Sequence, residues 1–479
     1  MRIAMLSPEI TPFAKTGGLA DVVGTLSLAL ERRGHELCLI MPAYRCVLRE
    51  HFTLEETPLK LAVPVSDRHE EGSVLRTRIG QNISVYFICA QRYFDRDGLY
   101  GTSHGDYPDN AQRYVFFSRA ALEVLRQEPV EVVHCHDWHC GLSIVFLKTQ
   151  RHRYPELISA KTVLTVHNLG FQGIFGESQW HLLDLDKSYF TSNHLEFYGN
   201  VNFLKGGLTF ADKITTVSPS YAREIMDMEQ GFGLDGVLRQ RAPDVVGILN
   251  GVDYEQWSPQ TDPFIAKRYS EHNLTAKRVC KKSLQQNLGL PGQSDVALLG
   301  MICRLTSQKG IDLVEKIFDA LMERELQMVL LGKGELRYEQ FFMSAAACFS
   351  EKFAARIGFD EALAHQIEAG ADIFLMPSLY EPCGLNQMFS LKYGTIPVVR
   401  AVGGLKDTVQ DYDSEKWTGT GFVFGPYEAQ ALLEAIERAL RVFKDKNAWT
   451  AIRRQAMSMD FSWDRSAELY SALYQELAN

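Results

Sequence analysis

Short apolar runs alternate with amphipathic segments along the first half of the chain. Apolar runs bounded by turn residues predict buried strands, and a 3.6-residue period predicts helices. Strands that alternate with helices are typical of a parallel sheet covered on both faces. We therefore expect a doubly wound α/β domain over residues 1–245. Its strands are expected at 2–7, 36–41, 83–88, 130–134, 162–166 and 213–217, with helices at 19–33 and 111–126.

The same pattern restarts near residue 245 and predicts a second domain over residues 246–457. An amphipathic helix at 462–477, within the last segment 458–479, is expected to pack back on the first domain. The predicted fold class is α/β, with two doubly wound Rossmann-like domains facing a central cleft, where strand ends and helix N-termini bind ligands. Strands are expected at 296–303, 327–331, 372–376 and 396–400, and helices at 310–324, from 335 and near 384.

Composition narrows the possible partners. The 479 residues carry a net charge of −9, which disfavours a nucleic-acid partner because such proteins gather Lys and Arg on one face. A neutral polysaccharide tolerates an acidic surface, whereas an anionic ligand needs a local cationic pocket. Nine scattered cysteines, an odd number, indicate reduced thiols. Without a basic leader or an apolar run near the ~18 residues of a membrane span, we expect a cytoplasmic protein with no membrane partner.

A glycine-rich loop separates the first strand from the first helix. It reads Lys15-Thr16-Gly17-Gly18-Leu19-Ala20-Asp21. Glycines let a backbone approach a ligand closely, and a helix N-terminus offers free N–H groups to an anion. An ordinary Gly-Gly turn beside a solvated lysine explains the same residues.

Histidines mark the ends of two further strands of the first half. The segment His134-Cys135-His136-Asp137-Trp138-His139-Cys140 is dense enough in His and Cys to suggest zinc, but a structural zinc site needs a second pair of ligands that the sequence does not offer. We expect this strand end to present Asp137 and Trp138 to the cleft, although a purely structural role fits almost as well. His167-Asn168 follows the strand at 162–166, where His167 could bond a sugar hydroxyl or be a satisfied core histidine.

Two cations lie at a strand-to-helix loop of the second half. Arg304 and Lys309 stand five residues apart in CRLTSQKG, residues 303–310. Arginine gives a planar fork for phosphate oxygens, and lysine gives a compact charge. Two solvated surface charges would be the simpler explanation, but the position at a strand end favours phosphate binding.

An acidic loop precedes another helix of the second half. The loop reads Tyr380-Glu381-Pro382-Cys383-Gly384-Leu385-Asn386, and we expect Gly384 and Leu385 to open the helix and point N–H groups at a phosphate. Glu381 would repel that phosphate, so we expect it to hold sugar hydroxyls instead, unless it only stabilises the helix dipole. Residues 403–404, Gly-Gly, are expected to form another close-approach loop.

Other chemistries find no support in the sequence. It holds no Walker A loop, GxSxG elbow, HExxH pair or complete GxGxxG motif. Gly332-Lys333-Gly334 begins like the last of these, but Arg337 stands where its third glycine belongs. A nicotinamide-dependent oxidoreductase is therefore disfavoured.

Taken together, these motifs resemble the family of bacterial glycogen synthases and plant starch synthases over nearly the whole chain. Their order and spacing are specific, although no single motif is. They are KTGGLADV at 15–22, HDWH at 136–139, HN at 167–168, TVSPSYAREI at 216–225, LNGVD at 249–253, SQKG at 307–310, EPCGL at 381–385, KYGTIPVVR at 392–400 and GGLKDTV at 403–409.

The resemblance implies a GT-B fold and an enzyme that transfers glucose from ADP-glucose to the non-reducing end of an α-1,4-glucan, with retention of configuration and release of ADP. It also implies roles for matching residues, with no cofactor or metal. Lys15, His167, Arg304, Lys309 and Glu381 would be catalytic, whereas Gly18, Asp21, Asp137, Asn168, Asn250, Cys383, Gly384, Leu385 and Asn386 would bind substrate.

The expected chemistry is stabilisation of a departing diphosphate. Arg304 and Lys309, with Lys15 from the other domain, would neutralise the charge that develops on the leaving oxygen. Because these cations come from both domains, we expect the cleft to close for reaction and to exclude water. Since the protein supplies the cations, we predict that no metal is needed.

Three positions depart from the family pattern, and two other functions stay open. The family usually has Thr at Asn386, often Tyr at Phe359, and Asn-Lys where this chain has Cys280-Lys281. A transferase of the same fold that uses UDP-glucose and a non-catalytic glucan-binding relative both remain alternatives.

Overall fold

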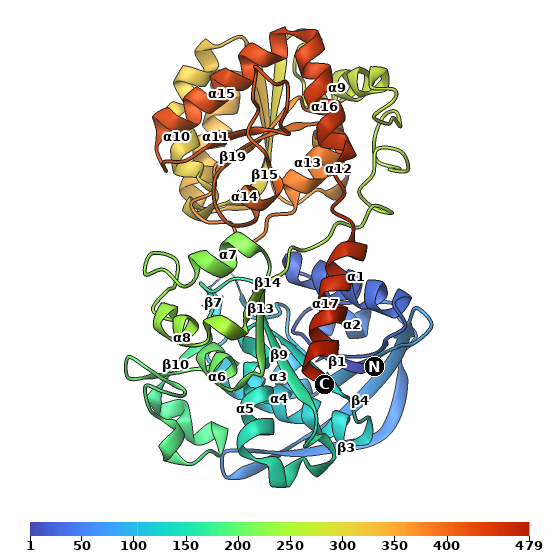
Figure 1. Cartoon of the computed structure of the whole chain (residues 1–479), viewed down its shortest axis with the longest axis vertical. Helices are drawn as coiled ribbons and strands as arrows, with labels where there is room; N and C mark the ends of the chain where they lie inside the picture. Colours follow the sequence, from blue (N-terminus) through green and yellow to red (C-terminus); the bar gives the residue numbers. More distant parts are fainter. Residues whose placement is uncertain (103, 479) are drawn as a thin grey trace. The chain divides into compact units, whose positions relative to one another are not determined.

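The computed structural model describes residues 1–102 and 104–478. The chain forms two compact domains (Figure 1). The first comprises Met1–Gly251 together with Trp463–Asn479, and the second comprises Val252–Ser462.

A sheet of nine strands forms the centre of the first domain. Its order is β14-β13-β9-β8-β1-β2-β5-β4-β3, in which β14 to β5 run parallel and the β3–β4 hairpin is antiparallel. The order reverses between β1 and β8, so that ligand-binding loops are expected beyond the carboxyl ends of these two strands. The strands are β1 Arg2–Leu6, β2 Glu36–Pro42, β3 Glu55–Val65, β4 Arg68–Ile79, β5 Ile83–Cys89, β8 Val132–His136, β9 Lys161–Val166, β13 Lys213–Thr216 and β14 Val245–Gly247.

Helices cover the first domain's sheet and differ in how deeply they are buried. Helix α5 is apolar around its whole circumference and is buried from Trp138 to Leu147, as such a helix must be. Helix α17 lies along α1 (Figure 1), and Ser471 Oγ is 2.8 Å from His35 Nε2. The helices are α1 Gly18–Arg32, α2 Arg45–Arg49, α3 Gln91–Phe94, α4 Asn110–Gln127, α5 Trp138–Thr149, α6 Phe203–Phe210, α7 Pro219–Glu224, α8 Asp235–Gln240 and α17 Trp463–Ala478. Short strands are β6 Gly101–Thr102, β7 Gly105–Asp106, β10 Ile174–Gly176, β11 Glu196–Phe197 and β12 Asn200–Asn202.

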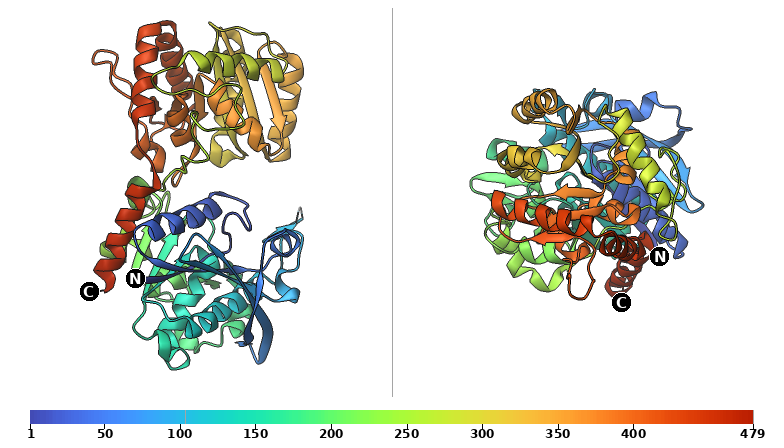
Figure 2. Two further views of the ribbon diagram at one scale, coloured as in Figure 1. Left: turned by 90° about the vertical axis from the view of Figure 1, so that its right-hand side faces the viewer. Right: turned by 90° about the horizontal axis from the view of Figure 1, so that it is seen from above.

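The second domain holds a parallel sheet of six strands in the order β17-β16-β15-β18-β19-β20. In chain order this is 3-2-1-4-5-6, the doubly wound Rossmann arrangement, and the order reverses between β15 and β18. Helices lie on both faces of this sheet (Figures 1 and 2). The strands are β15 Ala297–Leu305, β16 Leu326–Gly334, β17 Phe353–Ile357, β18 Ile373–Met376, β19 Ile396–Arg400 and β20 Phe422–Phe424. The helices are α9 Thr275–Asn287, α10 Ile311–Glu323, α11 Leu336–Cys348, α12 Glu361–Gly370, α13 Asn386–Tyr393, α14 Gly403–Thr408, α15 Ala429–Lys444 and α16 Lys446–Ser458.

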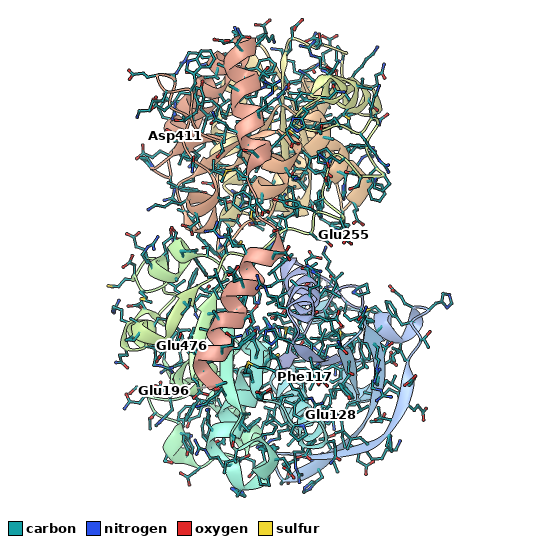
Figure 3. All side chains as sticks on the ribbon, turned by 45° about the vertical axis from the view of Figure 1, so that its right-hand side comes forward. Phe117, Glu128, Glu196, Glu255, Asp411 and Glu476 are labelled. Atoms are coloured by element: carbon teal, nitrogen blue, oxygen red, sulfur yellow. The ribbon has the colours of Figure 1, made fainter. Side chains whose placement is uncertain are left out.

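Burial follows the sequence pattern in both domains. Phe117 on α4 is fully buried, whereas Glu255 and Asp411 are exposed (Figure 3). The first seven residues of β16 are all buried, without the alternation of a half-exposed strand, as expected of a strand covered on both faces. Over the residues that the structure describes, no helix is long and apolar enough to cross a membrane.

Several boundaries differ from the sequence expectation. Strand β8 runs to His136 instead of stopping at His134, because the histidines are themselves buried in the sheet. Helix α13 begins at Asn386, so Leu385 precedes the helix instead of opening it. Gly403 and Gly404, expected in a loop, open α14. The β3–β4 hairpin was not expected, since its strands are rich in charge and bury few residues.

Candidate active site

The reversal point of the second domain's sheet joins a lysine to a glutamate. Lys309 follows β15 and Glu381 follows β18, and adjacent strands of a parallel sheet end at the same edge. Lys309 Nζ lies 2.8 Å from Oε1 and 2.6 Å from Oε2 of Glu381. The carboxylate side chain is only 6% exposed and the lysine side chain 18% exposed, so the pair is largely buried. Each charge therefore depends on the other for solvation.

The loop that carries Glu381 is fixed from several sides. Ser378 Oγ donates to Glu381 Oε2 at 2.9 Å. Gly384 has φ +70°, a conformation that favours glycine, and the Gln387 amide donates to the carbonyls of Cys383 and Gly384 at 3.0 Å each. A Cβ on Gly403 would lie 1.8 Å from the Glu381 carbonyl oxygen. Only glycine lets α14 approach this loop so closely.

Arg304 presents an open guanidinium near the same strand end. Arg304 is the next-to-last residue of β15, and it lies opposite Lys333 of the neighbouring strand β16. The residue is exposed, and its one polar contact within the described residues, from Nη2 to Gln308 Oε1, is long at 3.4 Å. Such a contact contributes little. Arg304 thus keeps most of its hydrogen-bonding capacity for a ligand.

The glycine-rich loop of the first domain lies open at the start of α1. Residues 15–18 are all exposed, and Lys15 Nζ pairs with Asp21 Oδ2 at 2.8 Å. A Cβ on Gly17 would meet nothing within 4 Å, so the fold itself does not require glycine there. Glu9, 3% exposed, anchors the loop by accepting from the backbone N–H of Thr16 and from its hydroxyl, the latter at 2.6 Å.

Asp137 occupies the matching reversal point of the first domain, directly after β8. Its backbone has φ 58° and ψ −176°, a region used almost solely by glycine and costly for other residues, about 1–3 kcal/mol. Its Oδ1 accepts from the His167 backbone N–H at 2.7 Å. Burial raises the pKa of Asp137 to about 7, and the backbone N–H groups of His167 and Asn168 offset part of this effect. No lysine or arginine of the described chain forms an ion pair with it.

Three histidines form a chain behind Asp137, in which His134 and His136 are buried and His167 is partly buried. The His134 and His136 rings lie 4.2 Å apart because alternate residues of β8 share one face. His136 Nδ1 and His167 Nε2 are 3.0 Å apart, so one neutral ring donates its N–H to the other. Burial lowers the pKa of His167 to about 3, and His167 is therefore neutral at pH 7. Tyr474 of α17 contacts His134 Nδ1 through its hydroxyl at 2.8 Å.

Two asparagines of the expected site differ in whether their side-chain oxygens accept a hydrogen bond. Asn168 Oδ1 accepts from the Gly170 N–H at 3.0 Å and so shapes its own loop. Asn250 is 5% exposed, and among the residues that the structure describes its Oδ1 has no hydrogen-bond partner. A buried oxygen without a partner is costly, and a ligand donor would satisfy it. No group of three His, Cys, Asp or Glu within the described residues could hold a metal ion.

Two family models cover most of this chain. The starch synthase catalytic domain matches residues 2–240, and glycosyl transferases group 1 matches residues 285–455. The glycogen synthase of Anaeromyxobacter sp. (strain Fw109-5) is 48% identical over 100% of both chains, and that of Koribacter versatilis is 45% identical over 99% of this chain and 98% of its own. The chain belongs to the glycogen synthase and starch synthase family. The predicted family and glycogen synthase function are thereby confirmed.

Solved structures agree with this assignment to the glycogen synthase and starch synthase family. The catalytic domain of Arabidopsis thaliana starch synthase IV, bound to ADP and acarbose, superposes with a TM-score of 0.91 at 33% identity, covering 100% of this chain and 99% of that one. Sucrose-phosphate synthase from Thermosynechococcus elongatus, 17% identical with a TM-score of 0.63 over 99% of this chain and 98% of its own, shows the fold alone. The GT-B fold class and the enzyme class, a retaining glucosyltransferase, are confirmed.

The three departures from the family pattern have different settings. Asn386 donates from its amide to the Ile302 carbonyl at 2.9 Å, which ties α13 to β15 and occupies one of its two N–H groups. Phe359 is 89% exposed. Cys280 is buried, and its thiol donates to the Lys267 carbonyl at 3.1 Å, so it serves packing.

No supporting role was expected from the sequence for three residues that contact the site. Glu9 holds the first loop, Ser378 orients Glu381, and His136 contacts His167. Only His136 could have been found from the sequence, because it follows His134 by two residues and so lies on the same face of the strand. Glu9 and Ser378 act through contacts that the chain makes only after folding.

Proposed function

We propose that this family member transfers glucose from ADP-glucose to the non-reducing end of an α-1,4-glucan with retention of configuration and releases ADP. The second domain would hold the donor, and the first would hold the acceptor. The starch synthase IV catalytic domain bound to ADP and acarbose supports a nucleotide diphosphate and an oligosaccharide as ligands of this fold.

The Lys309–Glu381 pair is the observation that carries the proposal. A nucleotide sugar joins an anionic diphosphate to a neutral, hydroxyl-rich ring, so its site needs a cation next to a hydrogen-bond acceptor. A bidentate pair at 2.6–2.8 Å provides both within one ion pair. Arg304, exposed at the end of β15, would supply the second cation for the diphosphate. Cys383, Gly384 and Leu385 would bring backbone N–H groups to the same ligand, and the remaining N–H of Asn386 could join them.

First-domain residues would complete the site. Lys15 and Gly18, at the open N-terminus of the long helix α1, would approach the donor phosphates, with Asp21 fixing Lys15. Asp137 would accept from a sugar hydroxyl, and its strained backbone supports a functional role. His167 would offer Nδ1, because its Nε2 already contacts His136. Asn168 and the unsatisfied oxygen of Asn250 would line the same ligand.

In the proposed reaction, the bond between the glucose anomeric carbon and the phosphate oxygen breaks while the acceptor hydroxyl attacks from the same face. The acceptor proton passes to the departing phosphate oxygen. Arg304, Lys309 and Lys15 would stabilise the negative charge on that oxygen, usually the largest catalytic contribution. His167 is neutral at pH 7 and would act as a hydrogen-bonding group.

The direct test is incubation of the full chain with glycogen and either ADP-glucose or UDP-glucose, with nucleotide diphosphate release followed in a coupled assay. We expect ADP-glucose to be used with the higher kcat/KM. Preference for UDP-glucose would replace the donor in this proposal. Glycogen binding without turnover on either donor would support the non-catalytic alternative.

A further inference from the structure

Two consecutive residues of the first domain hold His167 at two different points. His136 ends β8, Asp137 follows it, and His167 follows the adjacent strand β9, so all three lie at one edge of the sheet. Asp137 Oδ1 accepts from the His167 backbone N–H at 2.7 Å, and His136 Nδ1 lies 3.0 Å from His167 Nε2. The backbone and the ring of His167 are thus both fixed, whereas its Nδ1 has no partner among the described residues and remains for a ligand.

A single proton lies in the contact between the two histidine rings. Burial lowers the pKa of His136 well below its ordinary value and that of His167 to about 3, so both rings are neutral at pH 7. A neutral imidazole carries an N–H on one nitrogen and a lone pair on the other. One arrangement has His136 donating from Nδ1, which leaves its Nε2 as a lone pair. In the other, His167 donates from Nε2, and the proton of His136 moves to its own Nε2.

The surroundings of His136 Nε2 decide between these two arrangements. His136 is fully buried, and its Nε2 has no hydrogen-bond partner among the residues that the structure describes. A buried N–H without an acceptor is rarer in proteins than a buried acceptor without a donor. The proton of His136 therefore lies on Nδ1, and His167 accepts it at Nε2. Since the other nitrogen of a neutral ring must then carry the hydrogen, His167 is protonated at Nδ1.

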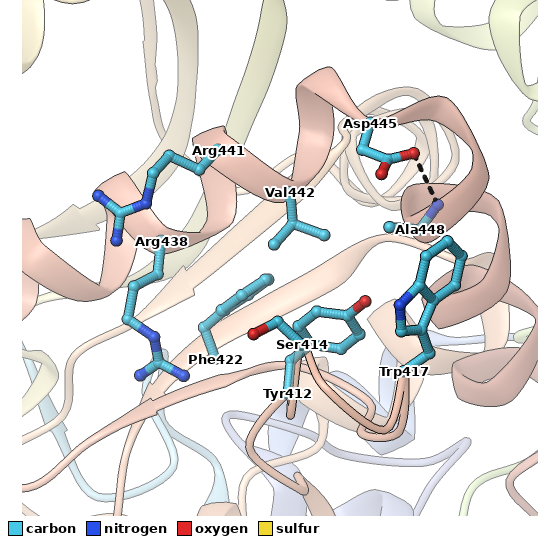
Figure 4. A pocket seen from close by; sticks show the side chains of 9 residues that line it. All are labelled: Tyr412, Ser414, Trp417, Phe422, Arg438, Arg441, Val442, Asp445 and Ala448. Atoms are coloured by element: carbon cyan, nitrogen blue, oxygen red, sulfur yellow. Dashed lines mark hydrogen bonds between the residues drawn. The ribbon is translucent and has the colours of Figure 1, made fainter.

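A pocket of about 460 Å³ in the second domain shows the opposite situation (Figure 4). Arg438 in its wall pairs with both oxygens of Asp411 at 2.8 Å each, and Asp445 Oδ1 accepts from the Ala448 N–H at 3.1 Å. Trp417 is 44% exposed there. Within the described chain, no residue that lines this pocket has a buried polar atom without a partner, so nothing in it fixes the position of a proton.

We infer that His136 is a positioning residue, which holds His167 in the tautomer protonated at Nδ1 so that His167 donates a hydrogen bond to an oxygen of the bound sugar. This inference deepens the proposed function and rests on it only in taking a sugar as the ligand. In this tautomer the ligand-facing nitrogen has no lone pair, so His167 cannot serve as a general base. The acceptor proton has to leave by another route, which supports its transfer to the departing phosphate oxygen.

Spectra of the full chain labelled with ¹⁵N-histidine test the tautomer directly. Long-range ¹⁵N–¹H correlations distinguish a ring nitrogen that carries a proton from one with a lone pair. Among the 13 histidines, His136 and His167 are assigned by the signals lost in His136→Asn and His167→Asn. At pH 7 and without any ligand, we expect the proton on Nδ1 of both rings. A proton on Nε2 of His167 would overturn the inference, whether or not the protein turns over any donor.

Variants of His136 test whether this side chain sets the tautomer. His136→Leu removes the donor, so the proton of His167 should distribute over both ring nitrogens. His136→Asn places an amide N–H near the position of Nδ1 and should restore the tautomer protonated at Nδ1. His272→Asn is the matched control, because the His272 side chain is 87% exposed in the second domain, and it should leave the His167 signals unchanged. A His167 ring that stays protonated only at Nδ1 in His136→Leu would contradict the positioning role.

Steady-state kinetics connect the tautomer to the reaction. His136→Leu should lower kcat/KM for ADP-glucose about tenfold, the size of one lost hydrogen bond, and His136→Asn less than about threefold. His272→Asn should keep the parent value. Equal losses in the two His136 variants would contradict the positioning role. If His136→Leu fails to fold, the parent spectrum and His136→Asn still decide the tautomer. A parent protein that turns over neither ADP-glucose nor UDP-glucose would contradict the proposed function, and the spectra would remain a separate test of the tautomer.

Discussion

The two domains place an acidic side chain at the same topological position and solvate it in opposite ways. Glu381 and Asp137 both follow the strand at which the order of their parallel sheet reverses. Glu381 lies in an ion pair with Lys309 and accepts from the Ser378 hydroxyl. Asp137 accepts backbone N–H groups without a paired cation in the described chain, and burial raises its pKa to about 7.

This difference matches the parts of the substrate that each domain would meet. A diphosphate requires fixed cations, and the second domain provides them next to Glu381. Neutral sugar hydroxyls require hydrogen-bond acceptors. The first domain offers the Asp137 carboxyl group, which is held on a strained backbone and has no paired cation in the described chain. The comparison teaches that a shared topology fixes where a site lies, whereas the side chains around it decide which charge the site tolerates.

The largest expected effect is on kcat when Arg304, at the end of β15, is replaced. Arg304→Ala should lower kcat about 10²–10³-fold, the usual loss when one charge-stabilising donor is removed. Its melting temperature should stay unchanged, because Arg304 makes only one long contact within the described chain. Arg278→Ala, an exposed arginine on α9, is the control and should keep full activity. A loss below tenfold, about 1.4 kcal/mol, would argue against the leaving-group role.

A smaller effect is expected on the stability of the ion pair. Lys309→Met leaves Glu381 buried without its cation and should lower the free energy of unfolding by about 3 kcal/mol. Adding Glu381→Gln removes the orphaned charge, so the double variant should recover most of that loss. Urea unfolding of the four proteins measures the coupling. Additive losses in the double variant would show that the two side chains do not depend on each other.

The opposite response is expected at Asp137. Its pKa is raised from 3.8 to about 7 in the folded state, so the protonated form is stabilised at low pH and that stability is lost as the pH rises through 7. The shift corresponds to about 4 kcal/mol, of which we expect Asp137→Asn to recover about 2 at pH 8 and almost none at pH 4. Thermal unfolding of both proteins from pH 4 to 8 measures this. A variant that is less stable than the parent at pH 8 would contradict the uncompensated burial.

The smallest expected effect is at the exposed loop. Lys15 pairs with Asp21 at 48% and 33% side-chain exposure, and such exposed pairs contribute only about 0–1 kcal/mol, often nothing measurable. Lys15→Ala should therefore leave the urea midpoint unchanged while raising the KM for ADP-glucose. Lys316→Ala is the control for both measurements, because Lys316 is an exposed lysine that also pairs with an aspartate, Asp312. A clear loss of stability in Lys15→Ala would mean that the loop depends on this pair for its structure.

Strand patterns predicted much of the fold because apolar runs are local signals. The expected strand at 396–400 is β19, and the helix at 310–324 is close to α10, Ile311–Glu323. The β3–β4 hairpin was not predicted because β3 buries only Leu61, Val63 and Val65. In addition, β4 pairs with β3 and with β5, and this pairing depends on the sheet edge that β5 offers only in the folded domain. Charged strands that bury so few of their residues carry too weak an alternation to be recognised alone.

By itself, the sequence determined the family, the two-domain α/β organisation and which residue types stand at the ends of strands, because motif order, hydrophobic period and chemistry are properties of the chain. Tertiary structure decided which of those ends meet. Lys309 and Glu381 are 72 positions apart, and only the order of β15 and β18 in the sheet brings them together. It also decided the pKa of Asp137 and the exposure of Trp417, because burial and solvation depend on neighbours that are distant in sequence and become neighbours only on folding.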